Sequence, residues 1–259
     1  MKKYTLVHPL FMSFYSKPLY REVGRNWTGW GLLYLAFLLS LYWIPEMIRF
    51  HTALSEFMAS EAPKVVSQMP IVTISKGEVS IDKPVPYTIY YPEKDTPLVI
   101  IDTSGKIASL ENTKALALVT KTKILMRRDD SDTRVLDLSR IDSLVIDQKR
   151  FYEWLAVVRD WSVAALYPFT LFFSFLYHTI LLLACATVGS FFTRMLKTDL
   201  SYKALVRLAA VAFTPPLILQ AVHIILGIEF PYRASISFLI AAGYLYYAVG
   251  ANAETGRAE

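Results

Sequence analysis

Four long apolar runs, separated by polar stretches, dominate the pattern of the chain. They cover residues 27–45, 161–192, 208–228 and 234–252. A helix crosses the roughly 30 Å hydrocarbon layer of a membrane with about 20 apolar residues, and each run is close to that length or longer. The pattern therefore predicts four transmembrane helices in an integral membrane protein.

The first run could also be read as the core of a cleaved signal peptide. However, 26 residues precede it, and no small-residue cleavage site follows it. We therefore expect this helix to be retained as a signal anchor.

The stretch between the first two runs, residues 46–160, has the charge balance of a soluble folded domain, with 16 basic and 17 acidic residues. Residues 46–63 have the apolar spacing of a helix that continues out of the membrane. Residues 136–154 are expected to form a helix that returns to it. No internal repeat or long linker divides the region.

Short runs rich in β-branched and aromatic residues lie between those two helices and predict a β-rich domain. Two of them, 71–74 and 79–81, flank Ser75-Lys76-Gly77-Glu78, which is typical of a hairpin with glycine at positive φ. Proline cannot donate to a sheet, so prolines should confine some strands to edges. The other strands are expected at 87–91, 97–102, 115–120 and 123–128, and the prolines are Pro84, Pro86, Pro92 and Pro97.

Lysine and arginine mark the cytoplasmic side of short membrane loops. Residues 1–26 carry five and residues 193–207 carry four, whereas the short loop 229–233 carries Arg233 alone. We therefore predict cytoplasmic chain ends, with 253–259 as a cytoplasmic tail and the β-rich domain on the extracytoplasmic side. Long domains are exempt from this rule and can be translocated. All five tryptophans fall at predicted ends of the first two helices, where amphipathic rings prefer to lie; they are Trp27, Trp30, Trp43, Trp154 and Trp161.

Composition agrees with a membrane protein and argues against a nucleic-acid partner. Hydrophobic residues make up 54% of the chain, above the roughly 45–50% of an ordinary soluble domain. The formal net charge is +5, but much of the basic charge clusters beside the apolar runs. The single cysteine, Cys185, excludes an intramolecular disulfide and a cysteine-based zinc site. We predict no cofactor and no metal.

The string Asp102-Thr103-Ser104-Gly105 follows an apolar run and is the most motif-like in the chain. An aspartic protease places its catalytic aspartate after such a strand, but in Asp-Thr-Gly or Asp-Ser-Gly and in two copies. Here a residue is inserted and no second copy exists. The pattern favours a strand that ends in an Asx-type turn closed by Gly105.

Ionisable groups inside a membrane are costly to bury and indicate function by default. The apolar runs contain no carboxylate, lysine or arginine at mid-depth, and only His178, His223 and the neutral Gln220 qualify. Ser174 lies one helical turn before His178, and Gln220 lies about one turn before His223. Without an oxyanion-forming glycine motif, hydrogen bonds between helices are a better interpretation than a serine dyad.

Two features of the apolar runs predict local geometry. Pro215 and Pro216 should kink the third helix, as a static packing feature or as a hinge beside a cavity. The small residues Cys185 and Gly189 share one face of the second helix and predict close helix packing, within the chain or in a homo-oligomer. The basic loop 193–207 is suited to contact with anionic lipid.

Several strings taken together resemble the bacterial membrane proteins gathered as domain-of-unknown-function family 1189. They are SFYSKPLYR (13–21), IDTSG (101–105), SYKAL (201–205) and FTPP (213–216). The resemblance covers nearly the whole chain and implies a bacterial inner-membrane location. The family is similar in its last three helices to the Yip-like superfamily, mostly trafficking or scaffold proteins without enzymatic activity. It supplies no catalytic residue to carry over.

The leading hypothesis is a non-enzymatic interaction, scaffold or sensing module whose β-rich domain binds a protein partner, an envelope component or a small ligand. The alternative is a transporter-associated or lipid-handling protein that uses the Pro215-Pro216 kink and the intramembrane polar groups. A cavity among the helices would favour the alternative. A third hypothesis, an enzyme at the membrane face, needs a cleft that holds Asp102 beside a second titratable group with a perturbed pKa.

Overall fold

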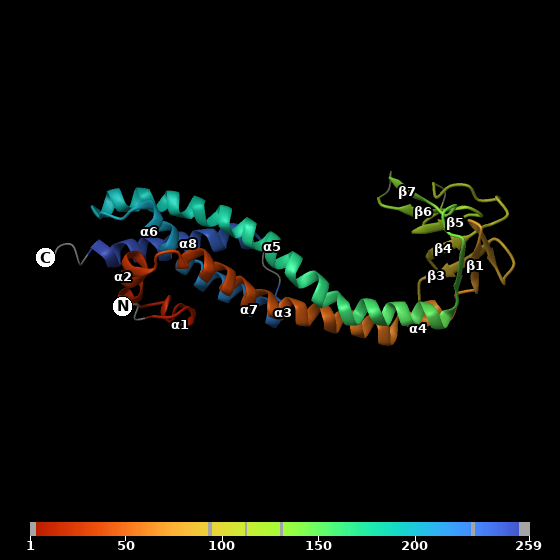
Figure 1. Cartoon of the computed structure of the whole chain (residues 1–259), viewed down its shortest axis with the longest axis horizontal. Coiled ribbons are helices and arrows are strands. Elements are labelled where there is room, and N and C mark those ends of the chain that lie inside the picture. The colour runs from red at the N-terminus through yellow and green to blue at the C-terminus, as the bar shows by residue number, and fades with distance from the viewer. Residues whose placement is uncertain (1–3, 93–94, 112, 130–131, 229–230, 254–259) are drawn as a thin grey trace. The chain divides into compact units, whose positions relative to one another are not determined.

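A computed structural model describes residues 4–92, 95–111, 113–129, 132–228 and 231–253 of the 259-residue chain (Figure 1). These residues form two compact units. The helical unit comprises Met1–Phe50 and Val163–Glu259, and the sheet-rich unit comprises His51–Ser162. Two helices, α3 and α5, contribute to both.

The helical unit contains four helical stretches long and apolar enough to span a membrane. They are α3 (Trp30–Ser60), α5 (Gln148–Leu196), α6 with α7 (Tyr202–Ala212 and Thr214–Leu226), and α8 (Arg233–Ala253). The four predicted apolar helices are therefore confirmed as helices, with a sheet-rich region between the first two. The first begins at Trp30 rather than Trp27, because Gly29 adopts a left-handed turn with φ of 77°.

Two short helices, α1 (His8–Met12) and α2 (Lys17–Asn26), precede the first apolar run, and the hydropathy pattern did not indicate them. Ser16 caps α2 by accepting a hydrogen bond from the amide of Leu19. The apolar face of α2 is fully buried and contacts α6 and α8 (Figure 1). The N-terminal segment is thus part of the helical core.

The core of the helical unit centres on α6. Residues Leu208 to Ala212 have no exposed surface, and they pack with buried residues of α2, α3, α5 and α8. Small residues permit this close approach, as predicted for the second span. A β-carbon on Gly189 of α5 would lie 2.9 Å from Cδ2 of Leu245 and 3.3 Å from Cδ2 of Leu205.

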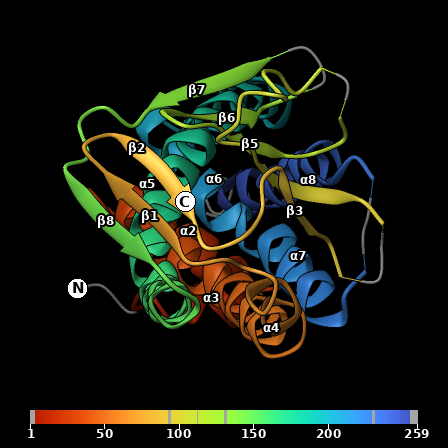
Figure 2. The same cartoon turned by 90° about the vertical axis from the view of Figure 1, so that its right-hand side faces the viewer.

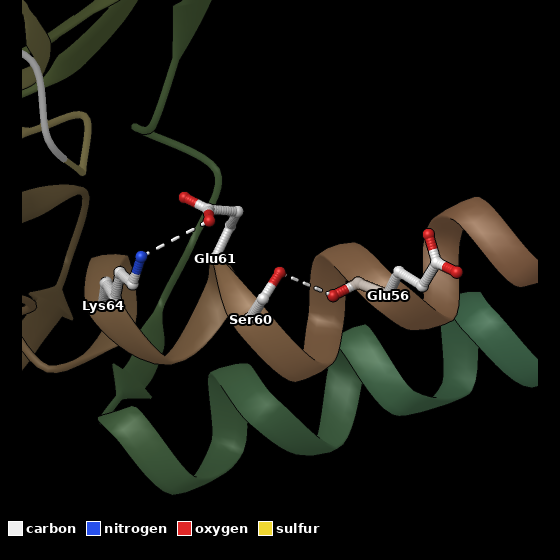
Figure 3. Close-up of polar contacts among 4 residues, drawn as sticks. All are labelled: Glu56, Ser60, Glu61 and Lys64. Carbon is white, nitrogen blue, oxygen red and sulfur yellow. Dashed lines mark hydrogen bonds and ion pairs between the residues drawn. The ribbon is translucent and has the colours of Figure 1, made fainter.

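In the sheet-rich unit, α3 ends at Ser60, whose hydroxyl donates to the Glu56 carbonyl at 2.8 Å (Figure 3). The short helix α4 (Ala62–Val66) follows at once. Nζ of Lys64 lies 3.4 Å from Oε1 of Glu61 across its first turn (Figure 3). The outgoing helix predicted for 46–63 is therefore present, with a break at Glu61.

A three-stranded antiparallel sheet in this unit has the order β2-β1-β8 (Figure 2). Its strands are β1 (Val72–Ser75), β2 (Glu78–Ile81) and β8 (Ser143–Ile146). The predicted hairpin is confirmed: Lys76 and Gly77 both have positive φ, as a two-residue type I′ turn requires. A side chain at Gly77 would also collide with Ser139.

The second sheet has five strands in the order β3-β4-β5-β6-β7 (Figure 1). They are β3 (Tyr87–Tyr90), β4 (Pro97–Ile101), β5 (Ala117–Val119), β6 (Lys123–Arg127) and β7 (Thr133–Asp137). Among these described strands, only β4 and β5 pair in parallel. Strand β3, between Pro86 and Pro92, lies at the sheet edge as predicted, whereas Pro97 belongs to an inner strand, β4. It tolerates Pro97 at its first residue, beside a register shift at Ile89/Tyr90.

The helix predicted for residues 136–154 is also wrong over its first half. Residues 136–137 complete β7, 143–146 form β8, and α5 begins only at Gln148. Leu138 packs between Ile74 and Val79 in a small buried cluster. Residues 143–146 form a strand because they pair with β1, which is a tertiary contact, although their local spacing also fits a helix.

Candidate functional site

A cavity of about 470 Å³ lies among the helices of the helical unit, between α3, α5, α7 and α8. Apolar and aromatic side chains form most of its wall, and a few polar groups converge on it. This combination is typical of small-molecule sites. The lining residues are Tyr42, Trp43, Thr170, Phe173, Ser174, Tyr177, His178, Leu181, Phe213, Leu217, Gln220, Arg233, Ala234 and Ser237.

Gln220 is the centre of the polar wall. Its Oε1 accepts a hydrogen bond from the Tyr42 hydroxyl of α3 at 3.0 Å, and its Nε2 donates to the Ser237 hydroxyl of α8. One side chain of α7 therefore joins three helices, which is the interhelical role predicted for it. The indole Nε1 of Trp43, also in the wall, is buried and has no hydrogen-bond partner among the described residues.

His178 lies in the same wall, half-buried on α5. Its Nδ1 lies 2.9 Å from the Ser174 carbonyl and 3.2 Å from the Ser174 hydroxyl. An imidazole nitrogen that donates to a carbonyl cannot also accept a hydroxyl proton. The pair is thus arranged as a helix-internal contact rather than as the interhelical bond that was predicted, and Nδ1 is not available as a base for Ser174.

Pro215 and Pro216 are buried at the start of α7, and the helix is interrupted just before them at Phe213. Neither proline has an amide hydrogen, so the carbonyls of Val211 and Ala212 lose their usual partners. The predicted kink is therefore present as a division into α6 and α7. Beside it, the Thr214 and Tyr34 hydroxyls hydrogen-bond at 2.6 Å.

His223, the other predicted histidine, does not line this cavity. It lies on α7 about one turn beyond Gln220, where its carbonyl accepts the Ile228 amide as the helix ends at Gly227. The structure therefore brings Gln220 and His178 to the wall of one cavity, and His223 lies outside that wall. Tyr42, Ser237 and Arg233 were missed, because no local pattern indicates which face of each helix meets the cavity.

Asp102 has no exposed surface and lies at the end of β4 in the sheet-rich unit. Its Oδ1 accepts from the amide and hydroxyl of Ser104 at 2.9 and 2.5 Å, and its Oδ2 accepts from the Ile107 amide at 2.6 Å. Gly105 follows with φ of 82°. This is the Asx-type turn predicted from the sequence.

The electrostatics of Asp102 fit this structural role. Burial raises the pKa of the carboxyl, but the hydrogen bonds from Ser104 and Ile107 outweigh burial, and the pKa lies below its ordinary value. No cavity described in this unit is lined by Asp102. Among the described residues, no group of three or more His, Cys, Asp or Glu side chains could hold a metal ion.

These features define a class: a protein with four long apolar helices, a sheet-rich unit between the first two, and a mainly apolar cavity with a few polar groups among the helices. The chain belongs to the family described as "Protein of unknown function (DUF1189)", whose model matches residues 7–249. The resemblance to that family is confirmed. The Yip-like similarity stays a prediction.

One relative is an uncharacterised protein of Rickettsia prowazekii (strain Madrid E), 22% identical over 131 residues. The alignment covers 46% of this chain and 45% of the relative. No solved structure matches the chain. Function is therefore argued from the site itself.

Proposed function

We propose that the four apolar helices cross a bacterial inner membrane, with both chain ends cytoplasmic and the sheet-rich unit extracytoplasmic. Two observations support this. Each helix has an uncharged or nearly uncharged 18-residue stretch long enough to span the hydrocarbon layer. The short loops carry nine basic residues on one side and one on the other.

In this arrangement α1 lies within the apolar layer rather than in the cytoplasm. One groove of about 260 Å³ is lined by Leu10 and Phe11 of α1 together with Leu38 of α3 and Leu217 of α7. Leu38 is eight residues inside α3, roughly 12 Å along the helix. The stretch that contains α1 would then be a re-entrant element, with the chain start before it and α2 after it on the cytoplasmic side.

We infer that the protein is a non-enzymatic, lipid-handling membrane protein that binds an amphiphilic molecule in the cavity between α3, α5, α7 and α8. The cavity is the observation that carries this proposal. Its wall is largely apolar, which suits an acyl chain. Arg233 supplies a cation for an acidic headgroup, and Gln220 and His178 supply hydrogen bonds.

The interaction module is the second candidate, and one feature of the sheet-rich unit favours it. Strand β7 is a sheet edge, and all five of its residues are exposed, including Val135 and Leu136. An exposed apolar edge can pair with an extended segment of a partner protein. The helical cavity is the more specific feature, because it combines shape, apolar wall and directed polar groups.

The test is lipid retention by the full chain, purified in mild detergent and measured by native mass spectrometry. The Ala234→Trp variant places an indole in the cavity wall. We expect the unaltered chain to retain a phospholipid-sized ligand and Ala234→Trp to retain about tenfold less, since the bulky ring occupies the binding volume.

The matched control is Ser235→Trp, which adds the same ring at the next, exposed position of α8, outside the cavity wall. It should retain ligand like the unaltered chain. Equal retention by both variants, or no retained amphiphile in the unaltered chain, would contradict the proposal. A discrete protein partner recovered through β7 would instead favour the second candidate.

A further inference from the structure

A second cavity, of about 660 Å³, lies at the opposite end of the helical unit from Arg233, where α2 and α8 end and α6 begins. Its wall is polar, unlike that of the first cavity. The lining residues are Gly24, Arg25, Leu196, Lys197, Thr198, Asp199, Leu200, Ser201, Ala204, Arg207, Asn252 and Ala253.

Cationic side chains dominate this wall. Arg25, Lys197 and Arg207 face one carboxylate, Asp199, so the lining has a net charge of +2. Arg207 is held in place, because its Nε donates to the Val23 carbonyl at 3.2 Å and its guanidinium also donates to the Gly24 carbonyl. Arginine fixed in this way is suited to binding phosphate oxygens.

Lys197 reaches the wall through an unusual backbone conformation. It follows the last turn of α5 with φ of 54°, a left-handed position that glycine usually occupies. The amide of Thr198 donates back to the Thr193 carbonyl at 3.0 Å, which closes the helix end. The chain therefore places a charged side chain where the backbone geometry favours glycine.

The 11-residue helix α6 begins in the same wall. Ser201 is its N-cap, and the Ser201 hydroxyl accepts the Ala204 amide at 3.3 Å. The first amides of a helix have no acceptor within the helix and carry its partial positive charge. The Ala204 amide is already used by the cap, so the amides of Tyr202 and Lys203 are the ones that add hydrogen-bond donors for an anion to the three basic side chains.

Asn252 provides an independent sign of a ligand. Its side chain is only 7% exposed, and Nδ2 donates to the carbonyls of Tyr20 and Ala248 at 3.3 and 2.9 Å. These two carbonyls fix the orientation of the amide. Oδ1 is buried and receives no hydrogen bond from any described residue, and the same is true of the Thr198 hydroxyl. A buried acceptor of this kind requires a donor.

We propose that this cavity binds a phosphate ester that also carries an N–H or O–H donor, as in a phosphoethanolamine or phosphoglycerol headgroup. The phosphate oxygens would contact Arg25, Lys197, Arg207 and the α6 amides. The donor group would serve Oδ1 of Asn252, with Asp199 nearby to favour an ammonium. A lipid as the source of the headgroup rests on the proposed membrane insertion, whereas the phosphate chemistry does not.

The test uses the full chain in detergent micelles with three added phospholipids of equal acyl chains, and bound lipid is counted by native mass spectrometry. Phosphatidylethanolamine and phosphatidylglycerol should bind about tenfold more tightly than phosphatidylcholine, whose quaternary ammonium has no N–H. The Arg25→Gln/Lys197→Gln pair should weaken the two preferred lipids at least tenfold, because two charge-assisted contacts are lost.

The matched control is Arg194→Gln/Lys203→Gln, which removes the same charge from the same region without altering the cavity wall. Equal loss in both double variants would overturn a defined site. Equal binding of phosphatidylcholine would overturn the donor requirement. Competition by millimolar glycerophosphoethanolamine would support the site and assign its ligand to a soluble ester; without competition, the intact lipid is the ligand.

The same measurement in the Ala234→Trp background separates this site from the first cavity. Retained headgroup selectivity there would support an independent site, whether or not the first cavity holds an amphiphile. Loss of headgroup selectivity in Ala234→Trp, with Ser235→Trp unaffected, would overturn the inference of an independent second site. Thermal unfolding of each variant identifies any that fails to fold. Titration with phosphatidylethanolamine should raise the unfolding temperature of the unaltered chain and of the variants that keep the site, but not that of Arg25→Gln/Lys197→Gln.

Discussion

The two units use their polar side chains differently. In the helical unit, polar groups join segments far apart in sequence: Tyr34 bonds Thr214, and Tyr42 bonds Gln220, across 180 and 178 residues. In the sheet-rich unit, Asp102 bonds groups two and five residues away. These contacts of the helical unit hold separate helices together, whereas the contacts of Asp102 close a single loop.

Arg127 also makes its hydrogen bonds to nearby residues of the sheet-rich unit. Its guanidinium donates to the carbonyls of Ala115, Leu110 and Thr113 at 3.2, 2.5 and 2.6 Å. All three carbonyls lie in the loop between β4 and β5. The guanidinium of Arg127 is thus used to hold one loop of the sheet-rich unit.

The largest expected effect on stability comes from removing these hydrogen bonds of Arg127. Arg127→Ala removes three hydrogen bonds to carbonyls and leaves those carbonyls without their donor, so we expect a loss of about 3 kcal/mol in the opening free energy of the five-stranded sheet. Hydrogen exchange of the β5 amides in the full chain measures it.

The neighbouring Arg128→Ala variant is the control. Arg128 is 79% exposed and makes an ion pair with Asp132 at 3.6 Å, so its loss should change the same opening free energy by less than about 0.5 kcal/mol. A similar loss in both variants would show that charge, rather than the loop contacts of Arg127, stabilises the sheet.

The contrast between the units also explains what the sequence could predict. Local signals succeeded: the apolar length of the four helices, the Lys76-Gly77 turn and the Asx turn at Asp102 depend on nearby residues alone. Strand β8 was missed because pairing with β1, about 70 residues earlier, decides it. The wall of the first cavity could be predicted in part. Gln220 and His178 draw attention because they are polar residues within apolar runs, whereas Tyr42 and Arg233 lie at or near the ends of the apolar runs, where such residues are common.

A smaller effect is expected from pH in the sheet-rich unit. The pKa of Asp102 in the folded chain lies below its ordinary value of 3.8. Its stabilising contribution is therefore complete well above pH 4 and is lost as pH falls through the folded-state pKa. Hydrogen exchange of the Ser104 and Ile107 amides should show weaker protection below about pH 4.

Asp102→Asn tests the cause of that pH dependence. The asparagine amide accepts through its single oxygen, so its NH2 group would point at the donor of either Ser104 or Ile107. We expect the variant to lose about 1–2 kcal/mol of stability at neutral pH and to lose the acid step, which is the fall in protection below about pH 4. Asp95→Asn, an exposed substitution in the same unit, should keep the acid step. An acid step retained in Asp102→Asn would assign it to another carboxyl group.

The smallest expected effect is in the helical unit, although its polar contacts span the greatest sequence separation. The Tyr34 and Thr214 hydroxyls are fully buried, but under the proposed membrane insertion each helix would also find hydrogen-bond partners when separated from its neighbours. Hydrogen bonds between membrane helices are therefore worth about 0.6 kcal/mol on average and at most about 1.7. A double-mutant cycle of Tyr34→Phe and Thr214→Val, read from unfolding in mixed micelles, should give a coupling in that range. A coupling above about 2 kcal/mol would show that this pair lies in a dry, fixed interface, and that the helical unit depends on individual polar contacts as strongly as the sheet-rich unit depends on Arg127.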